Sequence, residues 1–114
     1  MKIDRSILNQ PWPVPGDASY PPSDRKRFEE CDSPVALSRL DMFDQLLLLN
    51  WCCKLKQRKV FNLQQSSYNL KHHFEQVSGV YVSNGAFKAA MLLVGFKAKD
   101  VGDLNWHFNV THVK

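Results

Sequence analysis

The feature that most constrains this chain of 114 residues is the order of its patterned segments between Val35 and Thr111. A leucine-rich helical stretch comes first, and a short strand-like apolar stretch follows it. Two further helical stretches are separated by a turn that contains glycine, and the last part alternates apolar and polar residues around a Gly-Asp turn. This order predicts a mainly helical α+β domain with three helices and a C-terminal β-hairpin.

The first helix is expected to run from residue 35 to about Lys59. Asp32-Ser33-Pro34 predicts its start, because a capping residue stands directly before a proline. A helix with so wide an apolar stripe either lies centrally or forms a dimer contact. Cations from Lys54 to Lys59 either complement the helix dipole or bind phosphate. The apolar positions are Leu37, Leu40, Phe43, Leu47 and Trp51, widened by Leu46, Leu48 and Leu49.

The short alternating stretch from Val60 to Leu63 predicts a strand. A second helix should then begin after a cap at Ser66 or Ser67 and end at about Val77. Ser78-Gly79 stops it, because glycine adopts the left-handed conformation at little cost.

A third helix is expected over residues 83–94, with Ser83 as its N-cap. Phe87, Ala90, Met91 and Val94 recur at helical spacing and predict its inner face. Gly95, followed by the apolar Phe96, is typical of a Schellman ending.

Two alternating runs, 96–99 and 105–111, predict the hairpin over residues 96–110. Lys97 and Lys99 should lie on its outer face. The residues expected to face inward are Phe96, Ala98, Trp106, Phe108 and Val110.

Residues 1–34 are predicted to form a separate extended arm, and residues 35–114 the folded domain. Five of the six prolines lie between Pro11 and Pro22, and consecutive prolines restrict the backbone to extended conformations. Trp12 and Tyr20 on such an arm are candidate anchors for a partner protein, although Trp12 packing on the chain's own domain fits equally well. A short helix at Asp24–Cys31 would have Asp24 as its N-cap.

The formal charge of the chain is +4, and residues 35–114 carry ten basic and five acidic groups. A basic folded part favours a polyanionic partner, although many small domains without such a partner are equally basic. No apolar run is long enough to span a membrane, and no signal peptide is recognisable.

The three cysteines suggest reduced thiols and a cytoplasmic location, because an odd number with two adjacent makes no disulfide framework. Neighbouring His72 and His73, like Cys52 and Cys53, point about 100° apart on a helix and cannot chelate one ion together. No catalytic motif or phosphate-binding loop is present. We therefore expect no metal, no cofactor and no enzymatic activity.

The chain resembles the winged helix-turn-helix domains of small bacterial, plasmid or phage proteins. Its segments 67–72, 81–87, 95–96 and 105–108 carry the resemblance, which covers roughly residues 35–111 and rests on the order of elements. The resemblance implies that Ser83, Asn84 and Lys88 lie on a recognition helix, with Lys97 and Lys99 on the wing.

The expected function is that of a small regulator that binds duplex DNA by helix 83–94 and the hairpin. Asn84 suits an adenine edge, and Lys88 suits guanine or phosphate. Lys71 and His72 on the second helix are candidate phosphate contacts. The chain has no arginine in the third helix, which departs from typical DNA readers.

The alternative is a protein-interaction module, such as a phage-type inhibitor or adaptor. It would bind a larger host complex through the arm and helix 35–59. A homodimer formed through the leucine-rich helix is compatible with either function.

Overall fold

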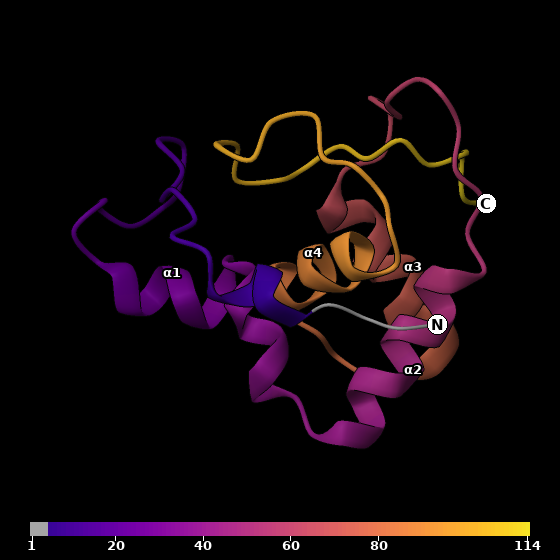
Figure 1. Cartoon of the computed structure of the whole chain (residues 1–114), viewed down its shortest axis with the longest axis horizontal. Coiled ribbons are helices and arrows are strands. Elements are labelled where there is room, and N and C mark those ends of the chain that lie inside the picture. Colours follow the sequence, from indigo (N-terminus) through magenta and orange to yellow (C-terminus); the bar gives the residue numbers. More distant parts are fainter. Residues whose placement is uncertain (1–4) are drawn as a thin grey trace.

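The centre of the molecule is a short helix, α4 (Asn84–Leu93), in a computed structural model that describes residues 5–114 (Figure 1). Every residue of α4 from Asn84 to Met91 is buried. The helices η2 (Pro34–Arg39), α2 (Met42–Cys53) and α3 (Ser67–Ser78) pack around it. The C-terminal segment crosses over the same helix, so α4 is enclosed and forms the core.

The composition of α4 explains how it can be enclosed. Ser83 caps the helix, since its hydroxyl accepts a hydrogen bond from the Ala86 amide at 3.1 Å. Small residues then allow close packing, and a Cβ atom on Gly85 would overlap the carbonyl oxygen of Ser33. The helix ends at Leu93, and Gly95 follows it two residues later with a left-handed φ of 106°. The predicted boundaries of this helix and its cap are confirmed.

The prediction of one helix from residue 35 to Lys59 is wrong. The segment forms the 3₁₀ helix η2 and then, after an extended Leu40, the separate helix α2. The side chain of Asp41 starts α2 by accepting from the Asp44 amide at 2.8 Å. A second capping residue inside the leucine-rich stretch therefore divides the helix. Because α2 ends at Cys53, residues 54–59 leave it as a loop.

The prediction of the second helix is confirmed in α3, which follows Ser66 as its N-cap. The Ser66 amide donates to the side chain of Asn69 at 3.0 Å. At the other end Gly79 has a φ of 73°, and its amide donates to the carbonyl of Glu75 at 2.9 Å.

The predicted winged helix, with its strand at 60–63 and its hairpin at 96–110, is wrong. Within residues 5–114 the β-structure consists of two isolated bridges, Ala98 with Phe108 and Gln57 with Val110. The backbone of Trp106 is engaged by α3 instead, since Ser67 both donates to its carbonyl (2.6 Å) and accepts from its amide (3.0 Å). The apolar residues of the two alternating runs are nevertheless buried, since Phe96, Trp106, Phe108 and Val110 lie in the core.

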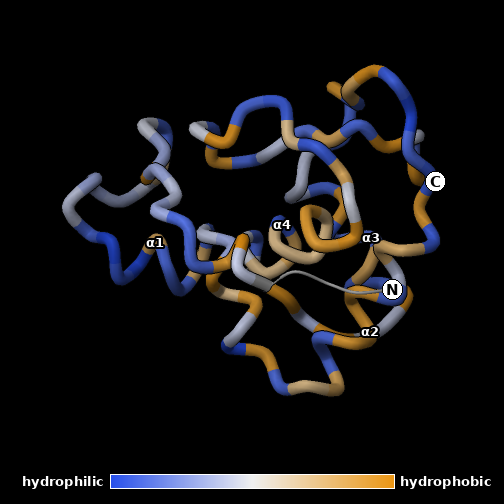
Figure 2. The backbone as a smooth tube through the Cα atoms, viewed as in Figure 1, coloured by the Kyte–Doolittle hydropathy of each residue, from blue (hydrophilic) through white to orange (hydrophobic). Residues whose placement is uncertain are grey.

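The prediction of an extended, separate N-terminal arm is also wrong, because the described part of residues 1–34 folds onto the helical core. It contains the 3₁₀ helix η1 (Arg5–Asn9) and the helix α1 (Arg25–Cys31), with the expected cap at Asp24. Trp12 is 8% exposed, and its ring centre lies 5.5 Å from that of Trp106. The apolar ring area of the arm is thus covered by the chain itself. In Figure 2 the apolar colour concentrates on α4 and α2, whereas α1 is largely hydrophilic.

Tyr20 provides the polar attachment of the arm. It is 7% exposed, and its hydroxyl donates to the Asp32 carboxylate at 2.6 Å. Burial raises the pKa of Tyr20, and the hydrogen bond and negative charge of Asp32 raise it further.

Tyr20→Phe should lower the free energy of unfolding by about 1–3 kcal/mol, the usual effect of losing a hydrogen bond to a charged group. Equilibrium urea unfolding at neutral pH measures this change. Tyr68→Phe is the matched control, since Tyr68 is 49% exposed. Equal stability of the Tyr20 variant and the wild type would show that this contact does not fasten the arm.

Candidate functional site

Lys88 does not lie on a DNA-facing surface. It is 1% exposed, its ammonium donates to the carbonyl oxygen of Asp32 at 3.0 Å, and it lies 4.7 Å from the centre of the Trp106 ring. Burial lowers the pKa of Lys88 to about 8, against the opposing negative charges of Asp32, Asp17 and Asp103. The guanine or phosphate contact expected of Lys88 is therefore not accessible in this structure.

Asn84 joins separate parts of the chain instead of presenting an amide to a base edge. Its side-chain nitrogen lies 3.1 Å from Asp32 Oδ1, 3.0 Å from the Leu104 carbonyl and 3.1 Å from Asn105 Oδ1. Its oxygen accepts from the Ser67 hydroxyl at 2.7 Å. Asn84 is 8% exposed, so it serves mainly to hold α1, α3 and the C-terminal loop together.

Lys71 and His72, both predicted phosphate contacts, share the carboxylate of Glu75. The Lys71 ammonium lies 3.3 Å from Glu75 Oε2, and His72 Nδ1 lies 3.0 Å from Glu75 Oε1. The Val82 amide donates to the same carboxylate at 3.0 Å. Lys71 is only 4% exposed, and it lies 5.4 and 5.0 Å from the ring centres of Tyr68 and Tyr81. Glu75 therefore brings these two predicted residues together, but only Lys71 lines a cavity, whereas the His72 side chain is 45% exposed.

That cavity has a volume of about 460 Å³ and lies where α1, α3, the start of α4 and the C-terminal loop meet. Its lining combines two charged carboxylates, an ammonium group, two phenol rings, a thiol and two amides. Burial raises the pKa of the Cys31 thiol, which therefore remains protonated at neutral pH. The residues that line the cavity are Ser19, Glu30, Cys31, Asp32, Tyr68, Lys71, Tyr81, Ser83, Asn84, Leu104 and Asn105.

Lys97 and Lys99 are exposed, and they lie on an outer layer made of segments 56–62, 97–99 and 107–111. The last of these segments bonds to the other two. On one side the Arg58 amide donates to the Asn109 carbonyl at 2.9 Å, and on the other the Lys99 amide donates to the His107 carbonyl at 2.9 Å. The inner side of this layer is the buried row that includes Phe108, so its charged side chains extend outward.

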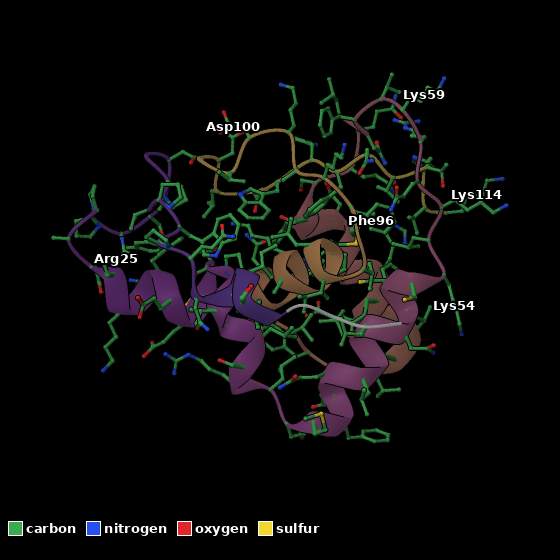
Figure 3. All side chains as sticks on the ribbon, in the orientation of Figure 1. Arg25, Lys54, Lys59, Phe96, Asp100 and Lys114 are labelled. Atoms are coloured by element: carbon green, nitrogen blue, oxygen red, sulfur yellow. The ribbon has the colours of Figure 1, made fainter. Side chains whose placement is uncertain are left out.

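The outer layer and its ends carry what we call the basic face. Figure 3 shows Lys54, Lys59 and Lys114 extending from one end of the molecule, opposite Arg25 on α1. Within residues 5–114 the ion pairs involve only Lys71 and His72, both with Glu75, so no cation of this face has a carboxylate partner. The basic face consists of Lys54, Lys56, Arg58, Lys59, Lys97, Lys99 and Lys114.

Sequence reasoning found two of these seven cations as site residues and left the role of residues 54–59 open. The signal that was available is the complete absence of Asp and Glu from residues 54–66, 95–99 and 104–114. What the sequence could not supply is the adjacency of these three segments, which depends on hydrogen bonds between positions about 50 residues apart, such as Arg58 with Asn109.

The predicted partner-binding residues Trp12 and Tyr20 are both buried within the molecule, as described above. No group of three His, Cys, Asp or Glu side chains in residues 5–114 is arranged to hold a metal ion. No helix in that part of the chain is both long and apolar enough to cross a membrane. No protein-family model, curated protein or solved structure matches this chain.

Proposed function

We propose that this chain is a non-enzymatic nucleic-acid-binding protein that holds the phosphate backbone of duplex DNA on its basic face. The observation that carries the proposal is the uneven distribution of charge. Seven of the fifteen basic residues and none of the eleven acidic residues lie in residues 54–66, 95–99 and 104–114. The rest of the chain, with eight basic and eleven acidic residues, is net acidic.

Surface lysines without carboxylate partners on one face favour a polyanion, because each ammonium that contacts a phosphate releases a condensed counterion. Lysine acts here as a point charge, without the bidentate geometry by which arginine reads guanine. Because α4 is enclosed, the helix expected to be the recognition helix does not offer its N-terminal residues to a groove. The proposal is therefore backbone binding with little sequence preference.

The proposed location is the cytoplasm, as expected from the sequence. What supports it is that Cys31, Cys52 and Cys53 are free thiols, which is typical of proteins in a reducing compartment.

Reversing two charges of the basic face should weaken duplex binding by about a hundredfold, because two phosphate contacts are lost. The salt dependence of binding should fall as well, since each phosphate contact contributes to it. The variant is Lys59→Glu with Lys99→Glu, both exposed. The measurement is fluorescence anisotropy with a labelled random 30-mer duplex at about 50 and about 200 mM salt.

The matched control is Lys26→Glu with Arg39→Glu, which changes the net charge equally but lies outside the basic face. It should reduce affinity only a few-fold, through net charge alone. Equal losses in the two double variants would reject a localised site, and absence of binding by the wild type at low salt would reject the function.

The alternative, a protein-interaction module, keeps one supporting observation after the arm is found to be buried. Met42, Phe43 and Leu46 in the first turns of α2 are 61%, 68% and 56% exposed. Three large apolar side chains at neighbouring helical positions are characteristic of a contact surface. A wild-type protein that does not bind DNA would make this surface the next one to test, by measuring self-association in sedimentation.

A further inference from the structure

We propose that the cavity between α1, α3 and the start of α4 is a binding site for one unpaired guanine base. This inference rests on the proposed nucleic-acid function and adds a base-specific site, separate from the basic face. The cavity volume of about 460 Å³ lies in the usual range of roughly 300–1,000 Å³ for small-molecule sites.

The walls suit a flat heteroaromatic ring. Tyr81 is 75% exposed and Tyr68 is 49% exposed, although both phenol rings line the cavity. Large aromatic side chains usually become covered in a folded protein, and two that stand open beside one cavity are typical of surfaces on which bases stack. The Lys71 ammonium lies 5.4 Å from the ring centre of Tyr68 and 5.0 Å from that of Tyr81, so it is close to both rings.

The cavity also has a built-in hydrogen-bond donor. Lys71 is 4% exposed, and its ammonium carries three N–H groups, of which one is engaged by Glu75 at 3.3 Å. The Glu75 carboxylate is further occupied by His72 and by the Val82 amide, which limits how strongly it holds Lys71. Lys71 thus retains donors for a ligand acceptor, and guanine presents two acceptors on one edge, O6 and N7.

The end of α1 supplies a hydrogen-bond acceptor to the cavity. Glu30 is exposed and lines the cavity, whereas both carboxylate oxygens of its neighbour Asp32 are already occupied by Tyr20 and Asn84. Glu30 is therefore the available acceptor. A carboxylate accepts from the N1–H and N2–H donors of guanine, which an adenine ring lacks. A carboxylate at the entrance also disfavours a ligand bound through phosphate alone.

The two edges together give the proposed selectivity. Guanine places acceptors toward Lys71 and donors toward Glu30, whereas adenine would place its N6 amino group against an ammonium and leave the carboxylate unpaired. A site built to hydrogen-bond one edge rejects a ring that lacks the matching groups, because the buried Lys71 ammonium would then face a donor in place of an acceptor.

The test compares GMP with AMP by titration of the full chain, with amide chemical shifts as the readout. The two nucleotides carry the same phosphate, so any contribution of the basic face cancels. We expect GMP to saturate a site that shifts residues around Tyr81 and Asn84, with at least about tenfold preference over AMP. Equal binding of the two nucleotides, or shifts confined to the basic face, would overturn the proposal.

Two variants, each with a matched control, locate the site. Tyr81→Ala should weaken GMP about tenfold or more through lost stacking, whereas Val77→Ala, which removes a side chain of similar exposure outside the cavity, should not. Glu30→Gln should reduce the preference for GMP over AMP about tenfold, whereas Glu29→Gln should leave it unchanged. Failure of either variant to differ from its control would contradict the assignment.

Duplex binding, which tests the proposed function, is measured separately. Lys59→Glu with Lys99→Glu should weaken duplex binding by about a hundredfold and leave the GMP-to-AMP ratio as in the wild type. Loss of that ratio in this double variant would contradict a base site separate from the basic face. Duplex binding without GMP selectivity would retain the proposed function and reject the guanine site. GMP selectivity without duplex binding would retain the guanine site and reject the proposed function.

Discussion

Gly85→Ala should destabilise the protein by about 1–3 kcal/mol, the range of overpacked core substitutions. The added Cβ would overlap the carbonyl oxygen of Ser33, a backbone atom that cannot rotate away. The sign of the effect is informative, because Gly85 is the second residue of α4 and alanine is ordinarily favoured over glycine within a helix. A loss of stability therefore reports the close approach of α4 to the start of η2.

Equilibrium denaturant unfolding measures this effect, and Gly16→Ala is its control. A Cβ atom added at Gly16 would meet no heavy atom within 4 Å, and the φ of Gly16 is not left-handed, so alanine there should be neutral or slightly stabilising. If Gly85→Ala raised the free energy of unfolding, α4 could not be packed against Ser33 as described.

Lys88→Met should remove a pH dependence of stability that the wild type possesses. Burial lowers the pKa of Lys88 from its ordinary 10.5 to about 8 in the folded protein. Between these two values the unfolded chain holds the Lys88 proton and the folded chain does not, so the free energy of unfolding rises with pH. The cost of burying the charge is fully present below about pH 8 and is relieved as pH rises from the folded pKa toward the unfolded one.

The measurement is the difference in unfolding free energy between the wild type and Lys88→Met at about pH 8 and about pH 10. The wild type should gain about 2 kcal/mol relative to the variant across this interval. Taking the difference cancels the opposite trend from Cys52, whose thiol pKa is raised by burial in both proteins. A difference independent of pH would mean that the folded protein does not depress the pKa of Lys88.

Local signals in the sequence placed the ends of the second and third predicted helices, but they did not place the break between η2 and α2 or the position of the helices in space. Ser83, Gly79 and Gly95 act through bonds within a few residues of themselves, and the structure bears out all three predicted ends. The fold class failed because it depended on which segments pair over long distances. The backbone of Trp106 bonds to Ser67, 39 residues away, and not to the strand expected at 96–99. The alternation of residues 105–111 does not indicate which of these two partners is bound.

In the candidate sites, too, local patterns predicted some residues correctly, whereas contacts between distant segments decided the others. Alternation predicted that Lys97 and Lys99 would face outward, and both are exposed. Lys88 was expected to face DNA, yet it is covered, because Trp106 and the Asp32 carbonyl reach it from distant parts of the chain. A lone cation on an otherwise apolar helix is the pattern from which its burial can be suspected.

The hydrogen bonds that converge on Asn84 have a consequence for how the chain is made. They join α4 to Asp32 near the beginning of the chain and to Asn105 near its end, with Tyr20 attached through Asp32. Contacts between remote segments form late, because closing long loops costs entropy before any contact compensates it. The core therefore cannot be completed before Leu104 and Asn105 are available to Asn84, and the segments from Tyr20 to Asn105 are expected to fold as one unit.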